Sequence, residues 1–342
     1  MAYDAVLIPG DGIGPEVTSA AMRVMEAAGA KIHWETHYAG ISALEQAGND
    51  CLLPDSTIEA IQRTRLALKG PCTTPIGHGF SSVNVGLRKH LDLYAAIRPV
   101  RSVDGVVTRY TDVDVVIIRE NTEGLYSGIE NQITEGVVTS LKVVTTVAVR
   151  RIARFAFEFA RSRGRKKVTV FHKANIMKLG DGLFLQTARE VYEDGYEDEV
   201  EYEEMIIDAG CMRLVQNPSD FDILLCENLY GDVLSDLCSG FVGGLGVTPG
   251  SNFGDIGAVF EAVHGSAPDI AGQGIANPLA LIMSGVMMLR HIADVHKDPV
   301  YDEIADRIRS AYNGCLTNGE KTADLGGTLS TEAFTDAVIS RL

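Results

Sequence analysis

The sequence has few positive charges for its length and no cysteine pattern typical of a metal or disulfide site. Its 342 residues include 46 aspartates and glutamates against 30 lysines and arginines, which gives a formal net charge of −16. Such an acidic surface repels the phosphates of nucleic acids and the anionic face of membranes, so we expect neither as a partner. The six cysteines form no C-x-x-C pair, which favours buried thiols in a reducing compartment.

A long apolar run and a recognisable leader are also absent. No apolar stretch approaches about 18 residues free of charge, so we expect no membrane-spanning helix. The first residues run directly into the strand-like YDAVLIPG, without the charged and apolar regions of a signal peptide. These two absences predict a cytoplasmic protein.

Short runs rich in β-branched residues alternate with helical patterns along the chain. Strands are predicted at 5–10, 66–71, 113–120, 166–173, 200–208 and 221–228, and helices at 15–28 and 56–63. This alternation predicts an α/β fold with a substantially parallel sheet. A glycine-rich loop at 10–14 follows the first strand. Its glycines are spaced G-x-G-x-G and Pro15 begins the helix, so we interpret it as a tight turn rather than a Rossmann fingerprint.

Three aspartates follow or end predicted strands and could share one cation. Asp232 and Asp236 are four residues apart at the start of a predicted helix, which places both carboxylates on one face. Asp208 ends the predicted strand 200–208. Carboxylates gathered at the C-terminal ends of parallel strands repel one another unless a cation neutralises them, and all-oxygen ligation suits Mg²⁺ or Mn²⁺. The alternative is that Asp232 caps the helix and Asp236 faces water.

Five arginines lie in one segment of this acidic chain: Arg88, Arg98, Arg101, Arg109 and Arg119. Arg98 and Arg119 follow apolar runs, and arginines at strand ends suit bidentate binding of carboxylates. Scattered surface salt bridges are the alternative, which we keep for Arg101 and Arg109.

Two further residues could transfer protons. Lys173 ends the predicted buried strand 166–173, where desolvation could lower its pKa enough for it to act as a base. Tyr126, in RENTEGLYSG, is a candidate acid. Taken alone, each is more often a structural residue.

Five motifs in this order resemble the isocitrate/isopropylmalate dehydrogenase family: GDGIGPE, RENTEGLYSG, HKANIMK, NLYGDVLSD and FEAVHGSAPDIAGQGIANP. The match covers essentially the whole chain. The resemblance implies a metal-dependent, obligately dimeric β-decarboxylating dehydrogenase with a two-domain α/β fold and a non-Rossmann nucleotide site. The large domain would comprise residues 1–94 and 243–342. The small domain would comprise 95–242, with a dimer clasp at about 127–144.

One segment, 81–101, separates substrates within the family, and here it resembles the isocitrate dehydrogenases. Their S-x-N-x-x-x-R pattern falls on Ser82, Asn84 and Arg88. The hydroxyl and amide can hydrogen-bond the extra carboxylate of isocitrate, whereas an isopropyl group would leave both unpaired at ~1–3 kcal/mol each. The pattern therefore favours isocitrate, with Arg98 and Arg119 holding further carboxylates.

The same resemblance favours NAD over NADP. NADP-using relatives carry Lys-Tyr where this chain has Asp269 and Ile270. A carboxylate accepts a hydrogen bond from a free ribose 2′-hydroxyl but repels a 2′-phosphate. The loop 321–327 also lacks the Tyr and Arg that NADP enzymes place there. By resemblance, further residues at the cofactor are Thr74, Asn175, Glu261, His264, Gly265 and Asn277.

The resemblance also implies how such a site works in a homodimer. Asp232 and Asp236, with Asp208 of the partner subunit, would hold the metal against isocitrate. Lys173 of the partner subunit would remove the hydroxyl proton, and Tyr126 would protonate the enolate carbon after CO₂ leaves, which gives 2-oxoglutarate. Two alternatives stay open. One is a sibling enzyme acting on homoisocitrate, 3-isopropylmalate or tartrate. The other is a non-catalytic regulatory subunit of a hetero-oligomer, which would be expected to lose the acid tyrosine or metal ligands.

Overall fold

The computed structural model describes residues 2–46, 51–74 and 82–342, and the chain divides into two compact units. The first unit comprises residues 1–91, 102–109 and 239–342, and the second comprises residues 92–101 and 110–238. Both chain ends therefore belong to the first unit. The segment 102–109, which the sequence prediction included in the small domain, clusters with the first unit here.

The sheet of the first unit follows the order β2 (Ile32–Thr36), β1 (Tyr3–Ile8), β3 (Leu66–Lys69), β12 (Ala258–Ala262) and β11 (Pro249–Phe253). Neighbouring strands are parallel except β11 and β12, which pair antiparallel. Residues 5–8 of β1 and all of β3 and β12 are buried. Continuous buried strands of this kind are typical of a sheet that is covered on both faces.

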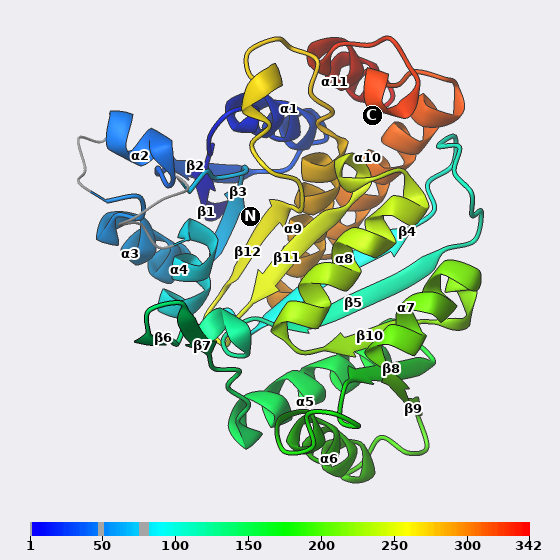
Figure 1. Ribbon diagram of the computed structural model, residues 1–342. Coiled ribbons are helices and arrows are strands. Elements are labelled where there is room, and N and C mark those ends of the chain that lie inside the picture. The colour runs from blue at the N-terminus through cyan, green and yellow to red at the C-terminus, as the bar shows by residue number, and fades with distance from the viewer. Residues whose placement is uncertain (1, 47–50, 75–81) are drawn as a thin grey trace. The chain divides into compact units, whose positions relative to one another are not determined.

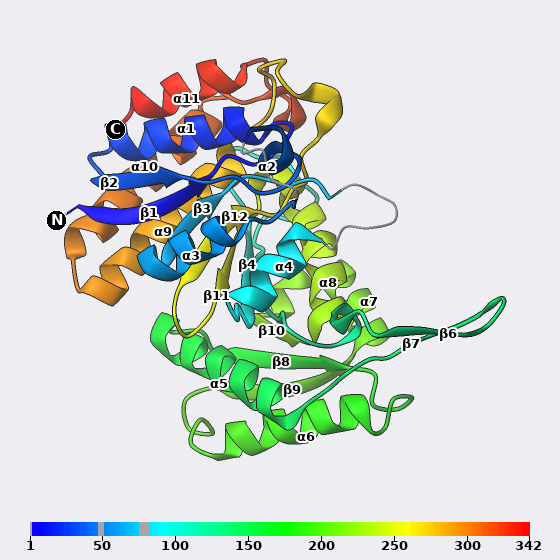
Figure 2. The same cartoon turned by 90° about the vertical axis from the view of Figure 1, so that its left-hand side faces the viewer.

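The helices of this unit are α1 (Gly14–Ala27), α2 (Ile41–Gln46), α3 (Asp55–Thr64), α4 (Val83–His90), α9 (Leu279–His296), α10 (Pro299–Thr317) and α11 (Thr331–Ile339), of which α3 and α9 pack directly on the sheet. α1 and α11 lie side by side, and α9 packs against α1, α10, β11 and β12 (Figures 1 and 2). By length and composition alone α9 could cross a membrane, but 61% of it is buried inside the structure, as in the core helix of a soluble protein.

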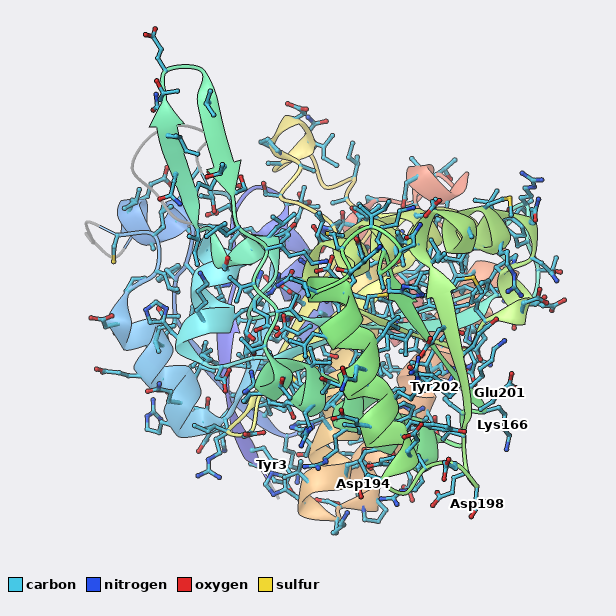
Figure 3. The ribbon with its side chains drawn as sticks, turned by 60° about the horizontal axis from the view of Figure 1, so that its bottom comes forward. Tyr3, Lys166, Asp194, Asp198, Glu201 and Tyr202 are labelled. Carbon is cyan, nitrogen blue, oxygen red and sulfur yellow. The ribbon has the colours of Figure 1, made fainter. Side chains whose placement is uncertain are left out.

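The sheet of the second unit follows the order β4 (Ala95–Arg101), β5 (Asp114–Glu120), β10 (Ile223–Cys226), β8 (Lys167–His172) and β9 (Glu201–Ile206). All neighbours are parallel except β4 and β5. Its helices are α5 (Thr146–Arg163), α6 (Gly180–Glu193), α7 (Ile207–Gln216) and α8 (Asn228–Val242), whose end belongs to the first unit. Tyr202, which Figure 3 labels, lies at the start of β9. It stacks on Tyr192 of α6 with ring centroids 4.9 Å apart.

A separate hairpin, β6 (Glu130–Thr134) with β7 (Val137–Ser140), projects from the rest of the second unit (Figures 2 and 3). Apolar side chains on it face solvent: Ile133 is 67% exposed and Val138 is 63% exposed. A two-stranded hairpin is at best marginally stable in water by itself, and exposed apolar side chains of this kind are typical of interaction surfaces.

Candidate active site

Arg119, one residue before β5 ends at Glu120, is a buried cation contacted by acceptors from α8. Its Nε and Nη2 donate to Oδ1 of Asn228 at 3.1 and 2.7 Å, and its Nη1 donates to Oδ1 of Asp232. The side chain is only 2% exposed. Gly231 allows this approach, because a Cβ there would lie 2.6 Å from Cβ and Cγ of Arg119. Helix α8 therefore lies directly against the aliphatic part of the Arg119 side chain, and its Asn228 and Asp232 hold the guanidinium in place.

Tyr126 lies beside this guanidinium, and both contact the same carboxylate. The Tyr126 hydroxyl donates to Oδ2 of Asp232, and Cζ of Arg119 is 5.0 Å from the centre of the tyrosine ring. Burial, and then the hydrogen bond to Asp232, raises the pKa of Tyr126. A raised pKa keeps the phenol protonated near neutral pH, as a proton donor requires.

Asp232 and Asp236 lie on one face of α8, as their spacing predicts. Burial, and then the negative charge of Asp232, raises the pKa of Asp236. The repulsion between these two neighbouring carboxylates would be relieved by a bound cation, so the pair is suited to bind one. Within the described residues no group of three His, Cys, Asp or Glu side chains is placed to hold a metal ion, so one chain offers this pair without its predicted third member.

Asp208 lies elsewhere in the second unit and is paired with Lys173. β9 ends at Ile206, and Asp208 falls in the first turn of α7 instead of ending the strand, as the sequence had predicted. Lys173 follows β8 directly, and its Nζ donates to Oδ1 of Asp208. Asn175, which comes two residues later, is exposed.

The two candidate arginines of β4, Arg98 and Arg101, differ in burial. Arg98 is buried, with 4% exposure, and its positive charge acts on Arg119 and Asp236. Arg101, at the exposed end of β4, makes a surface ion pair of 3.9 Å with Asp114. Arg98 thus joins the buried polar group of Arg119, and Arg101 has the surface role expected for it.

In the first unit, Arg88 faces a buried ion pair that sequence reasoning missed. Nζ of Lys69, at the end of β3, is 2.8 Å from Oε2 of Glu261 on β12, and Nη2 of Arg88 is 3.7 Å from Oε1. Asn252 donates to the same Oε1 at 2.8 Å. The available signal was Lys69 itself, a charged residue in the apolar run LALK.

Ser82 and Asn84 begin α4 in the first unit. The Ser82 hydroxyl caps the helix by accepting from the Val85 N–H at 3.5 Å, and the Thr74 hydroxyl accepts from the Val83 N–H at 3.1 Å. Oδ1 of Asn84 is buried and has no hydrogen-bond partner among the described residues. A buried acceptor without a donor suits contact with a ligand. Residues 75–81, between Thr74 and Ser82, lie outside the described residues.

The glycine-rich loop at 10–14 packs against the loop that carries the predicted cofactor residues. The Ile13 N–H donates to the carbonyl of Ser266 at 2.9 Å, and the Ser266 hydroxyl is 2.6 Å from that of Thr73. Gly12 has φ +60, and a Cβ there would lie 2.0 Å from the Ser266 carbonyl oxygen. The buried Asp11 accepts from the Thr73 N–H at 2.6 Å. These contacts make one surface from three separate loops.

The residues predicted to bind the adenosine of the cofactor, 264–277, lie on the loop that contains Ser266. Nε2 of His264 is buried without a hydrogen-bond partner among the described residues, and burial lowers the pKa of this histidine. Asn277 donates to Asp324 at 2.9 Å, which joins this loop to the loop 321–327. Gly265 and Asp269 are exposed and Ile270 is half-buried.

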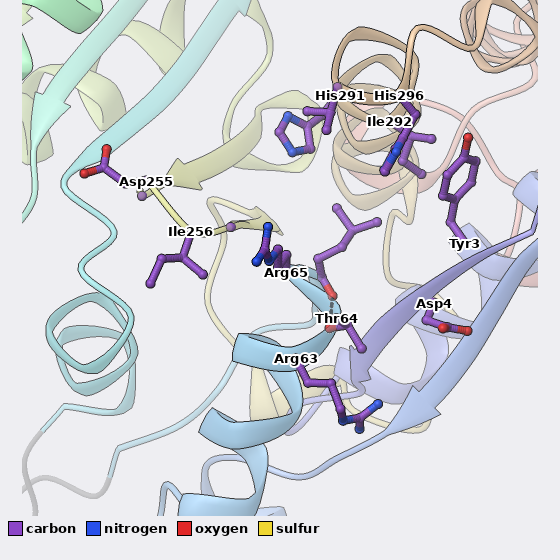
Figure 4. A pocket seen from close by; sticks show the side chains of 14 residues that line it. Tyr3, Asp4, Arg63, Thr64, Arg65, Asp255, Ile256, His291, Ile292 and His296 are labelled. Atoms are coloured by element: carbon purple, nitrogen blue, oxygen red, sulfur yellow. Dashed lines mark hydrogen bonds between the residues drawn. The ribbon is translucent and has the colours of Figure 1, made fainter.

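A cavity of about 400 Å³ lies in the first unit at the opposite ends of its strands (Figure 4). Its lining includes Tyr3 at the start of β1, Arg65 before β3 and His291 of α9. None of the predicted catalytic, substrate or cofactor residues lines it. Since ligands of α/β sheets gather at the carboxyl ends of the strands, this cavity is not the candidate active site.

Comparison with known proteins identifies relatives over the whole chain. The family model described as isocitrate/isopropylmalate dehydrogenase matches residues 4–338. The mitochondrial NAD isocitrate dehydrogenase catalytic subunit 5 of Arabidopsis thaliana is 50% identical, over 99% of this chain and 88% of its own length. A mitochondrial NAD isocitrate dehydrogenase regulatory subunit of Dictyostelium discoideum is 49% identical, over 98% and 91%. The crystal structure of isocitrate dehydrogenase from Methylococcus capsulatus is 46% identical, with a TM-score of 0.93 and 99% coverage of each chain.

These relatives contradict the expectation of a cytoplasmic protein. The plant and Dictyostelium proteins are both named as mitochondrial. The expectation rested only on the absence of a recognised leader pattern, and that absence does not decide the compartment.

Proposed function

The chain belongs to the isocitrate/isopropylmalate dehydrogenase family, and we propose that it converts isocitrate to 2-oxoglutarate and CO₂ with reduction of NAD. The observation that carries this proposal is the group around Asp232. A buried arginine and a protonated phenol contact one carboxylate, and a second carboxylate lies on the same helix face. Such a group provides charge for an anionic substrate and a proton for a carbon acid.

Isocitrate has three carboxylates, and we assign them to the arginines. Arg98 and Arg119 of the second unit supply two buried cations. Arg88 of the first unit supplies the third, with Ser82 and Asn84 beside it on α4. The Ser82 hydroxyl and the side-chain amide N–H groups of Asn84 can donate to a carboxylate, whereas the isopropyl group of isopropylmalate offers them no acceptor.

Asp232 and Asp236 would hold a divalent cation together with Asp208 of the partner subunit. Oxygen ligands of this kind suit Mg²⁺ or Mn²⁺. When bound, the metal supplies Lewis-acid stabilisation of negative charge on the substrate oxygens. Asp232 would then exchange its contacts with Arg119 and Tyr126, which frees their donors for the substrate.

Two side chains would move the protons. Nζ of Lys173, contributed by the partner subunit, accepts the proton of the isocitrate hydroxyl. Tyr126 Oη carries its proton at neutral pH, as a tyrosine of ordinary pKa does and as burial reinforces by raising that pKa, and donates it to the carbon that has lost CO₂. Arg98 and Arg119 hold the remaining carboxylates in place during both transfers.

The first unit would bind NAD, which accepts hydride from the substrate. We place the adenosine against His264, Asn277 and the exposed Asp269, on the loop that packs on the glycine-rich turn. Asp269 accepts from the ribose 2′-hydroxyl and repels a 2′-phosphate. Thr74, Asn175 and Glu261 would lie toward the nicotinamide, and Gly265 and Ile270 toward the adenosine. The first unit is thus the cofactor unit, and the second carries the metal and most of the substrate groups.

The active species would be at least a dimer, with residues 127–144 as its clasp. The exposed apolar side chains of β6 and β7 support an interface there. Relatives are named both as catalytic and as regulatory subunits. The catalytic assignment is favoured here because this chain keeps Tyr126, Lys173 and all three aspartates. By the names of its relatives, the protein would act in the mitochondrion.

The test is an initial-rate assay of the purified chain alone. NADH formation is measured with isocitrate, homoisocitrate, 3-isopropylmalate and tartrate, each with Mg²⁺, Mn²⁺ or a chelator. Isocitrate with a metal should give by far the highest kcat/KM, and the chelator should abolish the rate. Preference for another acid would support a sibling enzyme. A folded chain without activity on any of them would support a regulatory role.

A further inference from the structure

Asn228 is a fully buried amide at the first residue of α8, and within the described part of the chain its side chain hydrogen-bonds to Arg119 and to the loop before Tyr126. Its Oδ1 accepts from Nε and Nη2 of Arg119 at 3.1 and 2.7 Å. Its Nδ2 donates to the backbone carbonyl of Glu123 at 3.1 Å. The side chain is 0% exposed, so water does not compete for these bonds. Asn228 therefore connects Arg119, which we propose binds a substrate carboxylate, to the loop that leads to Tyr126.

That loop is held from its other side as well. The buried carboxylate of Glu120 accepts from the N–H of Thr122 at 2.8 Å and from the N–H of Glu123 at 3.0 Å. Gly124 comes so close to α8 that a Cβ there would lie 3.2 Å from Cβ of Asn228. The turn before Tyr126 is thus fixed by Glu120 within its own segment and by Asn228 from α8.

The chemistry at this position requires an amide. A guanidinium can only donate hydrogen bonds and a backbone carbonyl can only accept them. The residue between Arg119 and Glu123 must therefore present an acceptor on one side and a donor on the other. An aspartate would satisfy Arg119 but would place a carboxylate oxygen against the Glu123 carbonyl. A serine is too short to reach both partners.

We propose that Asn228 is a positioning residue, which holds the Arg119 guanidinium and the Tyr126 loop in the mutual arrangement that one substrate molecule needs. Arg119 must meet a carboxylate while Tyr126 reaches the reacting carbon of the same molecule. A single rigid amide that contacts both elements sets that relation. This inference rests on the roles proposed above for Arg119 and Tyr126.

Two variants test it, each compared with a control. Asn228→Asp places a second carboxylate beside Arg119, which already contacts Asp232, so less positive charge remains for the substrate. We expect the KM for isocitrate to rise about tenfold or more, as for the loss of one charged hydrogen bond, with a lower kcat. Asn228→Ser should change both in the same direction. The KM for NAD should stay within about twofold, because we assign NAD to the other unit.

Tyr196→Phe is the control, because it removes a partly buried hydrogen bond of 2.7 Å to Glu158 in the same unit, away from the site. It should lower the melting temperature and leave both KM values unchanged. A role of Asn228 in folding alone would give the same pattern. An unchanged isocitrate KM in folded Asn228→Asp or Asn228→Ser would therefore overturn the proposal, and so would failure of both to fold.

A double-variant comparison isolates the contact with Arg119. Arg119→Lys removes the paired donors that Oδ1 of Asn228 accepts. The rise in isocitrate KM caused by Asn228→Ser should therefore be several-fold smaller in the Arg119→Lys background than in the wild type. Full additivity would refute the positioning role. That result differs from a failure of the proposed function, because in that case the wild type itself would not oxidise isocitrate.

Discussion

Replacing Glu261 by glutamine should destabilise the first unit strongly, because it removes the countercharge of a buried lysine. The Lys69 side chain is 2% exposed, with its Nζ 2.8 Å from Oε2 of Glu261. Arg88 is a second cation, 3.7 Å from the other oxygen. Removing one partner of a buried pair typically costs 3–5 kcal/mol. Glutamine keeps the shape and the acceptor for Asn252, and Lys69 still donates to the Gly70 carbonyl at 2.9 Å. We therefore expect a loss of about 3 kcal/mol in the free energy of unfolding.

Urea denaturation of the wild type and the Glu261→Gln variant measures this loss. Asp336→Asn is the matched control, because its ion pair with Arg23 is surface-exposed, with side-chain exposures of 59% and 42%, and should cost under about 1 kcal/mol. The double variant Lys69→Met with Glu261→Gln should be more stable than Glu261→Gln alone. A loss below about 1 kcal/mol in Glu261→Gln, or no recovery in the double variant, would refute the reasoning.

Three further predictions concern cofactor choice, thiol chemistry and pH. Asp269→Lys with Ile270→Tyr should lower the NAD-to-NADP ratio of kcat/KM by about a hundredfold or more, as steady-state kinetics would show, and an unchanged ratio would move the adenosine site elsewhere. A thiol reagent at pH 8 should label Cys51 first, because Cys51 is exposed while burial raises the pKa of Cys72 to about 11, and Cys51→Ser should remove the fast phase. Burial lowers the pKa of His264, so below about pH 6.5 the unfolded chain binds a proton that the folded chain does not. Urea titrations at pH 7 and 5.5 should therefore show a larger loss of stability on acidification in the wild type than in His264→Gln, and equal losses would contradict the assignment.

Local patterns in the sequence predicted the elements that carry most of the candidate site. The apolar run at 221–228 and the spacing of Asp232 and Asp236 correctly predicted β10 and two carboxylates on one helix face. The α/β class is likewise confirmed. Among the strands of the two sheets, β2, β4, β11 and β12 were not predicted; Pro99 interrupts β4, and PGSNF of β11 has little β-branched character. Antiparallel neighbours of this kind have no signal in a search for alternating strands and helices.

Contacts between distant residues could not be predicted from the sequence. Lys69 and Glu261 lie on strands far apart in the chain, and only the pairing of β3 with β12 brings them together. Asn228 belongs to the motif NLYGDVLSD, in which the sequence analysis considered only the aspartates. Its burial results from the close approach of α8 to Arg119 of β5, which the sequence alone does not predict. Asp208 was placed on a strand because EEMIID continues the apolar pattern, whereas the helix begins one residue earlier at Ile207. Periodicity locates elements but does not determine which side chains meet.

The central claim is that two copies of this chain form a complete isocitrate-oxidising site, with Tyr126 from one and Lys173 from the other. Co-expression of Tyr126→Phe and Lys173→Met chains, carrying different tags, tests this directly through NADH formation from isocitrate. Each variant alone should be nearly inactive. In a two-fold symmetric dimer the mixed species has one site with both residues intact, so an equal random mixture should recover about a quarter of the wild-type rate. A mixture as inactive as the separate variants, with mixed dimers demonstrated by the tags, would contradict the account.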